Sequence, residues 1–126
     1  MKKSKKFMPL VYVCSPFAGD THKNILSARK YSRFVVNEGY IPIAPHLLFP
    51  QFLDDNSIPK DRKLGLKFGN VLMDKCREVW VFGEHISKGM ECEIKRAIKR
   101  KYKIRYFSEE LKEVENSAEI KNCIWK

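Results

Sequence analysis

Two glutamates near the start of a predicted helix are the residues of this sequence that point most directly to chemistry. Glu91 and Glu93 follow Gly89, and Ser87 stands where the helix is expected to begin. A helix N-terminus carries unpaired N–H groups and a partial positive charge, so it favours carboxylates and binds anions. Ser87 and these N–H groups can hold a phosphate or a sugar hydroxyl, although an ordinary N-cap is the simpler interpretation.

The helical pattern leaves open which of the two glutamates faces a crevice. At about 100° per residue, the apolar stripe of this helix runs between Glu91 and Glu93. The stripe consists of Met90, Ile94, Ala97 and Ile98. The two glutamates flank it on opposite sides, and either can be simply a first-turn carboxylate that the helix dipole favours.

The glutamates follow a strand and a loop, and this order of elements recurs along the chain. Predicted strands span residues 9–14, 40–44, 78–82 and 103–107. Predicted helices follow the first strand, span 60–75 and 87–101, and start again at Ser108. Such alternation is typical of a doubly wound, parallel α/β sheet, here of four to five strands with helices on both faces. Ligands bind such sheets outside the carboxyl ends of the strands.

Individual residues refine this architecture. Asp20 or Thr21 can cap the first helix, and Gly39 is a natural stop just past its end. Pro42 lacks an N–H group, so its strand should lie at a sheet edge or be irregular. Residues 45–61 form a long loop, which is either functional, for example as a lid, or a packed surface loop.

We expect one domain over residues 1–126, because this length suits a single core and no repeat or linker is visible. Residues 1–7 should be a basic, flexible lead-in, and residues 108–126 a C-terminal helix and tail. The apolar end of the tail, which includes Trp125, should dock on the core or on a second subunit.

The chain is basic, with 25 Lys and Arg against 15 Asp and Glu and a net charge of +10. This balance favours anionic partners without choosing between nucleotides, nucleic acid and an anionic membrane. Much of the excess lies in the N-terminal tail and in a cluster over residues 95–105. These clusters are either an anion-binding surface or a solvated tail and outer helix face.

Cysteine usage and hydropathy indicate a cytoplasmic protein without a membrane segment. The four cysteines form no CxxC pair, which argues for a reducing compartment. No apolar run approaches the roughly 18–20 residues that span a membrane. The basic N-terminus is followed by too short an apolar stretch for a signal peptide.

The sequence carries no motif for a cofactor or a metal ion. The loop SPFAGD after the first strand lacks both the dinucleotide fingerprint and the phosphate-binding loop of nucleoside triphosphatases. The three histidines, His22, His46 and His85, do not form a recognisable metal set. Tyr12 lies within the first strand, where a tyrosine is more often part of the core.

Three motifs taken together resemble the nucleoside 2-deoxyribosyltransferase-like superfamily. They are VYVCSPFAG near the start, GNVLMDKCREVWVFG in the middle and SKGMECEIKRA after it. The superfamily includes the deoxynucleoside 5′-monophosphate N-glycosidases, and the chain is most similar to a small branch of bacteria and phages. The resemblance covers residues 10–107. It implies a flavodoxin-like or Rossmann-like fold and cleavage of the N-glycosidic bond of a deoxynucleoside or its monophosphate.

The resemblance also implies roles for single residues. The family's nucleophile is a glutamate four residues after a glycine, which selects Glu93 over Glu91. The family's strand tyrosine matches Tyr12, and its phosphate-contacting serine matches Ser87. The family has an aspartate on the preceding helix where this chain has Asn70, which can bond a sugar hydroxyl but cannot act as a general acid. Asp74, one turn later, is a possible substitute.

The remaining substrate-binding candidates flank these residues. They are Ser15, Pro16, Phe17 and Gly19 in the first strand-to-helix loop, His46 in the long loop, and Gly89 and Met90 on the third helix. In the expected reaction Glu93 attacks C1′ of the deoxyribose, the base departs, and water or a second base resolves the intermediate. A homodimer or larger oligomer is expected from the resemblance.

The sequence leaves two other functions open. One is nucleotide binding without catalysis, to sense or sequester the nucleotide, and Asn70 favours this alternative. The other is a nucleic-acid-binding accessory protein, as the charge suggests, although the chain lacks a recognisable nucleic-acid-binding motif.

Overall fold

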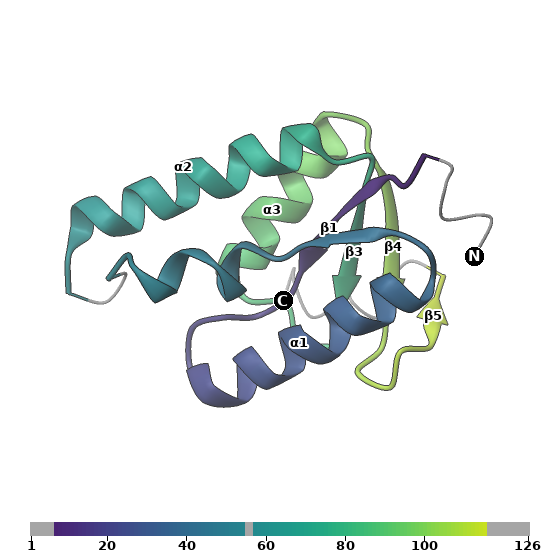
Figure 1. Ribbon diagram of the computed structural model, residues 1–126, viewed down its shortest axis with the longest axis horizontal. Coiled ribbons are helices and arrows are strands. Elements are labelled where there is room, and N and C mark those ends of the chain that lie inside the picture. Colours follow the sequence, from purple (N-terminus) through teal and green to yellow (C-terminus); the bar gives the residue numbers. More distant parts are fainter. Residues whose placement is uncertain (1–6, 55–56, 116–126) are drawn as a thin grey trace.

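A single five-stranded sheet carries the fold of the computed structural model, which describes residues 7–54 and 57–115 (Figure 1). The strands are β1 (Leu10–Cys14), β2 (Ile41–Ile43), β3 (Glu78–Phe82), β4 (Lys103–Phe107) and β5 (Glu113–Val114). They lie in the order β2-β1-β3-β4-β5, and all are parallel except β5, which runs antiparallel to β4. The predicted α/β class and the edge position of the strand with Pro42 are confirmed.

Three α-helices connect the parallel strands. They are α1 (Thr21–Asn37), α2 (Pro59–Lys75) and α3 (Lys88–Lys99). The side chain of Asp20 caps α1 by accepting from the N–H of Lys23 at 3.2 Å, which settles the choice between Asp20 and Thr21. Gly39 follows the end of α1 with φ +93°, a left-handed conformation that glycine adopts without strain.

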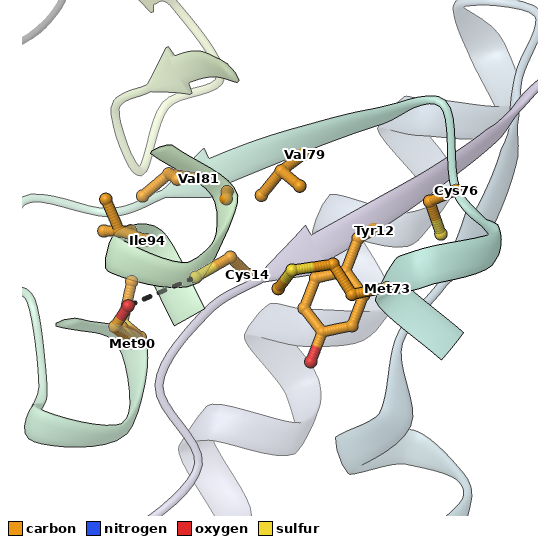
Figure 2. Packing of buried hydrophobic residues seen from close by; sticks show 9 residues of the cluster. Tyr12, Cys14, Met73, Cys76, Val79, Val81, Met90 and Ile94 are labelled. Carbon is orange, nitrogen blue, oxygen red and sulfur yellow. Dashed lines mark hydrogen bonds between the residues drawn. The ribbon is translucent and has the colours of Figure 1, made fainter. Parts of the chain in front are cut away.

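The alternation of side chains along β1 and β3 divides the core into two layers. Odd-numbered residues of β1, such as Val13, pack with Trp80 and Phe82 against α1. Even-numbered residues of β1, Tyr12 and Cys14, lie in the cluster that includes residues of α2 and α3 (Figure 2). Successive side chains of a strand point to opposite faces, so α1 covers one face of the sheet and α2 and α3 cover the other.

The connections reverse direction between β1 and β3. The chain leaves β1 through α1 toward β2 at one edge, and it leaves β3 through α3 toward β4 on the other side. Crevices form where the strand order reverses, outside the carboxyl ends of the two central strands. Cys14 is the last residue of β1 and Tyr12 lies two residues before it, so the topology places Cys14 where a ligand site is expected and Tyr12 close to it.

The predicted final helix at Ser108 is wrong, because residues 108–112 form a turn that leads into β5. The hydroxyl of Ser108 accepts from the N–H groups of Glu110 and Lys112, both at 3.2 Å. Leu111 has φ +69°, which a right-handed helix does not allow. The fork between Arg105 and Glu113, with contacts of 2.9 and 2.8 Å, then holds β5 against β4.

The long loop contains two single turns of 3-10 helix, η2 (Pro45–Leu47) and η3 (Phe49–Gln51). η2 packs against both α1 and α2, so this part of the loop is folded onto the domain. No helix among residues 7–54 and 57–115 is long and apolar enough to cross a membrane. The predicted lead-in, except for its last residue, and the end of the tail with Trp125 lie outside the described residues.

Candidate functional site

Glu93 reaches from α3 to the carboxyl end of β1, where two donors hold its carboxylate. The hydroxyl of Tyr12 donates to Oε2 at 2.5 Å, and the thiol of Cys14 donates to Oε1 at 3.2 Å. Tyr12 and Cys14 are two residues apart on one strand, so both side chains lie on the face that α3 covers (Figure 2). The resemblance singled out Tyr12 and Glu93 as residues of the site, but it did not predict the contact between them, and it gave Cys14 no role.

Glu91 points away from this centre and pairs with Lys95, with 3.7 Å between Oε2 and Nζ. The ambiguity of the helical pattern is thereby resolved on geometric grounds, since Glu93 is the glutamate that meets the sheet. Met90, Ile94 and Ala97 form the buried stripe of α3 as expected. Ile98, placed in the same stripe, is instead 57% exposed, because at about 100° per residue it lies on the Glu91 side of the helix, away from the face that Ala97 and Glu93 turn to the sheet.

Burial sets the protonation of the three side chains. It raises the pKa of Glu93, and the hydrogen bonds from Tyr12 and Cys14 partly oppose this rise. Burial and the charge of Glu93 raise the pKa values of Tyr12 and Cys14 well above their ordinary range. Tyr12 and Cys14 therefore stay protonated as donors, and Glu93 is the most acidic of the three groups and the first to ionise as the pH rises.

The loop after β1 is held by a residue that sequence reasoning missed. The side-chain amide of Asn24, in the first turn of α1, donates to the carbonyls of Phe17 and Ala18, both at 3.0 Å. Ser15 is buried at the end of the strand, whereas Pro16 is partly exposed. Gly19 has φ +96°, which explains a glycine at this turn.

Two of the predicted substrate-binding residues come together from different loops. The rings of Phe17 and His46 stack with centroids 4.9 Å apart and an angle of 20° between their planes. Farther along the long loop, Phe49 contacts Phe52 and Phe68 of α2, at 6.1 and 5.2 Å between centroids. Phe52 is 63% exposed, so an aromatic face remains open to solvent beside this loop.

The start of α3 has the cap that the sequence predicted. The hydroxyl of Ser87 accepts from the N–H of Met90 at 3.2 Å, and Gly89 is exposed beside it. Met90 is buried, and its carbonyl lies 4.0 Å from the thiol of Cys14. Ser87 thus has a structural role that leaves its hydroxyl hydrogen available to a ligand.

Helix α2 contributes a glycine rather than the expected amide to the centre. A Cβ atom on Gly69 would meet the hydroxyl of Tyr12 at 3.4 Å, so the small residue lets α2 pass close to the tyrosine. Asn70 is exposed on the next position of the helix. Asp74 binds Arg96, at 3.0 and 3.1 Å, and lies 3.5 Å from Arg100. Because Asp74 is held in these ion pairs, it is not placed to serve as the substitute acid.

Two surface hollows among the described residues lie apart from the Glu93 carboxylate. One of about 410 Å³ is lined by the cations of α3, Lys95, Arg96, Lys99 and Arg100. The other, of about 360 Å³, is mainly apolar and is lined by α1, β2, η2 and α2 residues, among them Pro42, Leu48 and Leu72. No group of three or more His, Cys, Asp or Glu side chains within residues 7–54 and 57–115 could hold a metal ion.

The fold is shared with a solved 2-deoxyribosyltransferase from the psychrotolerant bacterium Bacillus psychrosaccharolyticus. The two structures superpose with a TM-score of 0.66 over 85% of this chain and 77% of the other, at 16% sequence identity. A comparison with curated proteins finds no match. The model of a family described as a domain of unknown function, DUF7768, matches residues 9–107. The chain, from its first strand to the end of β4, therefore belongs to the DUF7768 family.

Proposed function

We propose that the protein cleaves the N-glycosidic bond of a deoxynucleoside or deoxynucleoside 5′-monophosphate, with Glu93 as the nucleophile. The observation that carries the proposal is the carboxylate of Glu93, partly buried and held by Tyr12 and Cys14 at the carboxyl end of a central strand. The fold shared with a 2-deoxyribosyltransferase supports the same class of chemistry. A carboxylate anchored in this way is oriented before the substrate arrives.

The reaction follows the course of a retaining glycosidase. The ionised Glu93 attacks C1′ of the sugar, the C1′–N bond breaks, and the base leaves with the electron pair and takes up a proton. Water or a second base then attacks C1′ and frees the carboxylate. The absence of a 2′-hydroxyl eases the development of positive charge on the sugar, which suits deoxyribose over ribose.

The surrounding residues suit the two ends of such a substrate. The stacked Phe17 and His46 offer aromatic surface for a base, and Phe52 of the same long loop exposes a further ring. Ser87 and the N-terminus of α3 offer a hydroxyl and N–H groups for the 5′ end. We further propose that the protein is a single-domain chain that forms a homo-oligomer in the cytoplasm. Size-exclusion chromatography with light scattering would test the oligomeric state.

Asn70 supports a second candidate, a protein that binds a nucleotide without cleaving it. This position carries an aspartate in the family that the sequence resembles, and an amide cannot donate a proton to the leaving base. Asp74 is held by Arg96 and Arg100, so it does not replace the missing acid. Under this alternative the protein still binds a nucleotide but no longer cleaves it.

Base release from a panel of deoxynucleosides and their 5′-monophosphates tests the proposal. Purified protein is incubated with each substrate, with and without a second free base, and the products are separated by chromatography. Release without added base identifies a hydrolase, and exchange identifies a transferase. Glu93→Gln should abolish both, whereas Glu91→Gln is the matched control on the same helix and should retain them.

The alternative has a separate signature in the same panel. Protection against thermal unfolding by a nucleotide, with no base released by the wild type, would replace the catalytic proposal with nucleotide binding. Base release that survives Glu93→Gln would exclude Glu93 as the nucleophile. Asn70→Asp should increase the rate if the missing acid limits it.

A further inference from the structure

The two oxygens of the Glu93 carboxylate are held by donors of unequal strength. Oε2 accepts from the phenol of Tyr12 at 2.5 Å, a short bond typical of an O–H donor to a carboxylate. Oε1 accepts from the thiol of Cys14 at 3.2 Å. A thiol is a weak donor, so Oε1 keeps more of its electron density than Oε2 does.

Cys14 has a second acceptor close by. The carbonyl of Met90, one turn earlier on α3, lies 4.0 Å from Sγ (Figure 2). The thiol is fully buried, and burial with the charge of Glu93 raises its pKa well above the ordinary range. It therefore keeps its proton and cannot compete with Glu93 as a nucleophile.

We propose that Cys14 is a positioning residue that orients Oε1 of Glu93 through a weak hydrogen bond and releases it on attack, so that Oε1 is the oxygen that bonds to the sugar. This inference rests on the proposed function. Neither composition nor the resemblance assigns Cys14 a role, and its place two residues after Tyr12 on the same strand face is the signal that points to it.

The atoms of this step balance with one molecule of water as the second reactant. The bond between Oε1 and C1′ forms as the C1′–N bond breaks, and the base takes the electron pair and a proton from water. The thiol of Cys14 keeps its proton and turns toward the Met90 carbonyl. Oε2 becomes the ester carbonyl oxygen and still accepts from Tyr12. The hydroxide left by the proton transfer then attacks C1′, and the electron pair of the C1′–O bond returns to Oε1.

The ionisable groups that surround this arrangement come from three parts of the chain. Tyr12 and Cys14 of β1 contact Glu93 directly. Tyr106 of β4 lies near Cys14, and Cys76 after α2 lies near Tyr12. Burial raises the pKa of Tyr106 and brings that of Cys76 to about 12, so both remain neutral through the range in which Glu93 titrates.

The titration of Glu93 in cysteine variants tests the inference. Carboxyl-labelled protein is titrated by NMR, with the Glu93 signal assigned from its loss in Glu93→Gln. Cys14→Ala should raise the pKa of Glu93 by about 0.5 to 1 unit, the size of a weak hydrogen bond. Cys14→Ser, which keeps a donor and makes it stronger, should lower the pKa. Cys76→Ala removes a thiol of the same core cluster that donates to the Leu72 carbonyl, and it should shift nothing.

Activity gives a second readout that packing alone would not move. The acid limb of the kcat/KM profile should shift to higher pH in Cys14→Ala and to lower pH in Cys14→Ser. An unchanged pKa of Glu93 in both Cys14 variants, or an equal shift in Cys76→Ala, would overturn the inference. If Cys14→Ala fails to fold, Cys14→Ser and the S–H stretching band of Cys14 still test whether the thiol donates to Glu93. An S–H band at the same frequency in wild type and Glu93→Gln would refute that hydrogen bond.

The same measurements separate this inference from the proposed function. Wild-type protein that releases no base removes the assignment of Oε1 as the attacking atom, and with it the proposed reaction. Active wild type with an unshifted Glu93 titration leaves the proposed reaction standing and removes the role of Cys14.

Discussion

The hydrogen bond between Tyr12 and Glu93 should stabilise the protein by an amount that depends on pH. Tyr12→Phe removes only the hydroxyl, which donates to Oε2 at 2.5 Å. Hydrogen bonds to charged groups contribute about 1.5–3 kcal/mol, against about 0.5–1.5 kcal/mol for neutral pairs. The charge-assisted part is therefore about 1–1.5 kcal/mol, and its loss should raise the pKa of Glu93 by about one unit.

A double-mutant cycle isolates the charge-assisted part of the hydrogen bond between Tyr12 and Glu93. The free energy of unfolding in urea is measured for wild type, Tyr12→Phe, Glu93→Gln and the double variant. The amide introduced by Glu93→Gln can still accept a neutral bond from Tyr12, so the coupling reports the charge. We expect about 1–1.5 kcal/mol above the pKa of Glu93 and a value near zero well below it.

Tyr102→Phe provides a matched control for the cycle. Its hydroxyl donates to the carbonyl of Met73 at 2.8 Å, and it makes no hydrogen bond to Glu93 among the described residues. Its coupling with Glu93→Gln should be near zero at every pH. A coupling below about 0.3 kcal/mol for Tyr12 at high pH, or one that does not change with pH, would refute a buried, ionised Glu93 anchored by this phenol.

Three further predictions concern the pH dependence, the loop after β1 and Asp74. The pKa of Glu93 is higher in the folded than in the unfolded state, so between these two pKa values the folded state binds more protons. The free energy of unfolding should therefore fall as the pH rises from the unfolded to the folded pKa. Urea unfolding at a series of pH values should show this fall, and Glu93→Gln should remove it. Asn24→Ala removes the bonds to the Phe17 and Ala18 carbonyls, each worth about 1 kcal/mol, so steady-state kinetics should show KM raised several-fold with a smaller change in kcat. Asp74→Asn weakens a partly exposed ion pair with Arg96, so thermal unfolding should show a loss of stability below about 1 kcal/mol while base release stays unchanged. A loss of base release in this variant would instead indicate that Asp74 acts as the acid.

The order of elements was predictable from the sequence because it rests on local patterns. Short β-branched runs, amphipathic helices and single residues such as Asp20, Gly39 and Pro42 act within a few positions of themselves, and the structure confirms each. The prediction of a final helix was wrong because the structure of this segment does not rest on a local pattern. It depends on the pairing of Glu113 with Arg105, eight residues earlier on β4, and on the left-handed conformation of Leu111.

The candidate site was only partly predictable, because its contacts join residues about eighty positions apart. Helical spacing could not choose between Glu91 and Glu93; the resemblance selected Glu93, and the packing of α3 on β1 separates the two by their contacts. The alternation along β1 could have paired Cys14 with Tyr12 on one face. No local pattern could have shown that Gly69, rather than Asn70, approaches the phenol, since that depends on where α2 crosses the sheet.

The covalent intermediate identifies the nucleophile. Protein quenched during turnover of a deoxynucleoside 5′-monophosphate is digested with trypsin, and the peptide of residues 89–95, which holds both Glu91 and Glu93, is sequenced by tandem mass spectrometry. We expect a sugar adduct on Glu93 that is absent in Glu93→Gln and unaffected by Glu91→Gln. An adduct on Glu91, or base release that continues in Glu93→Gln, would contradict it.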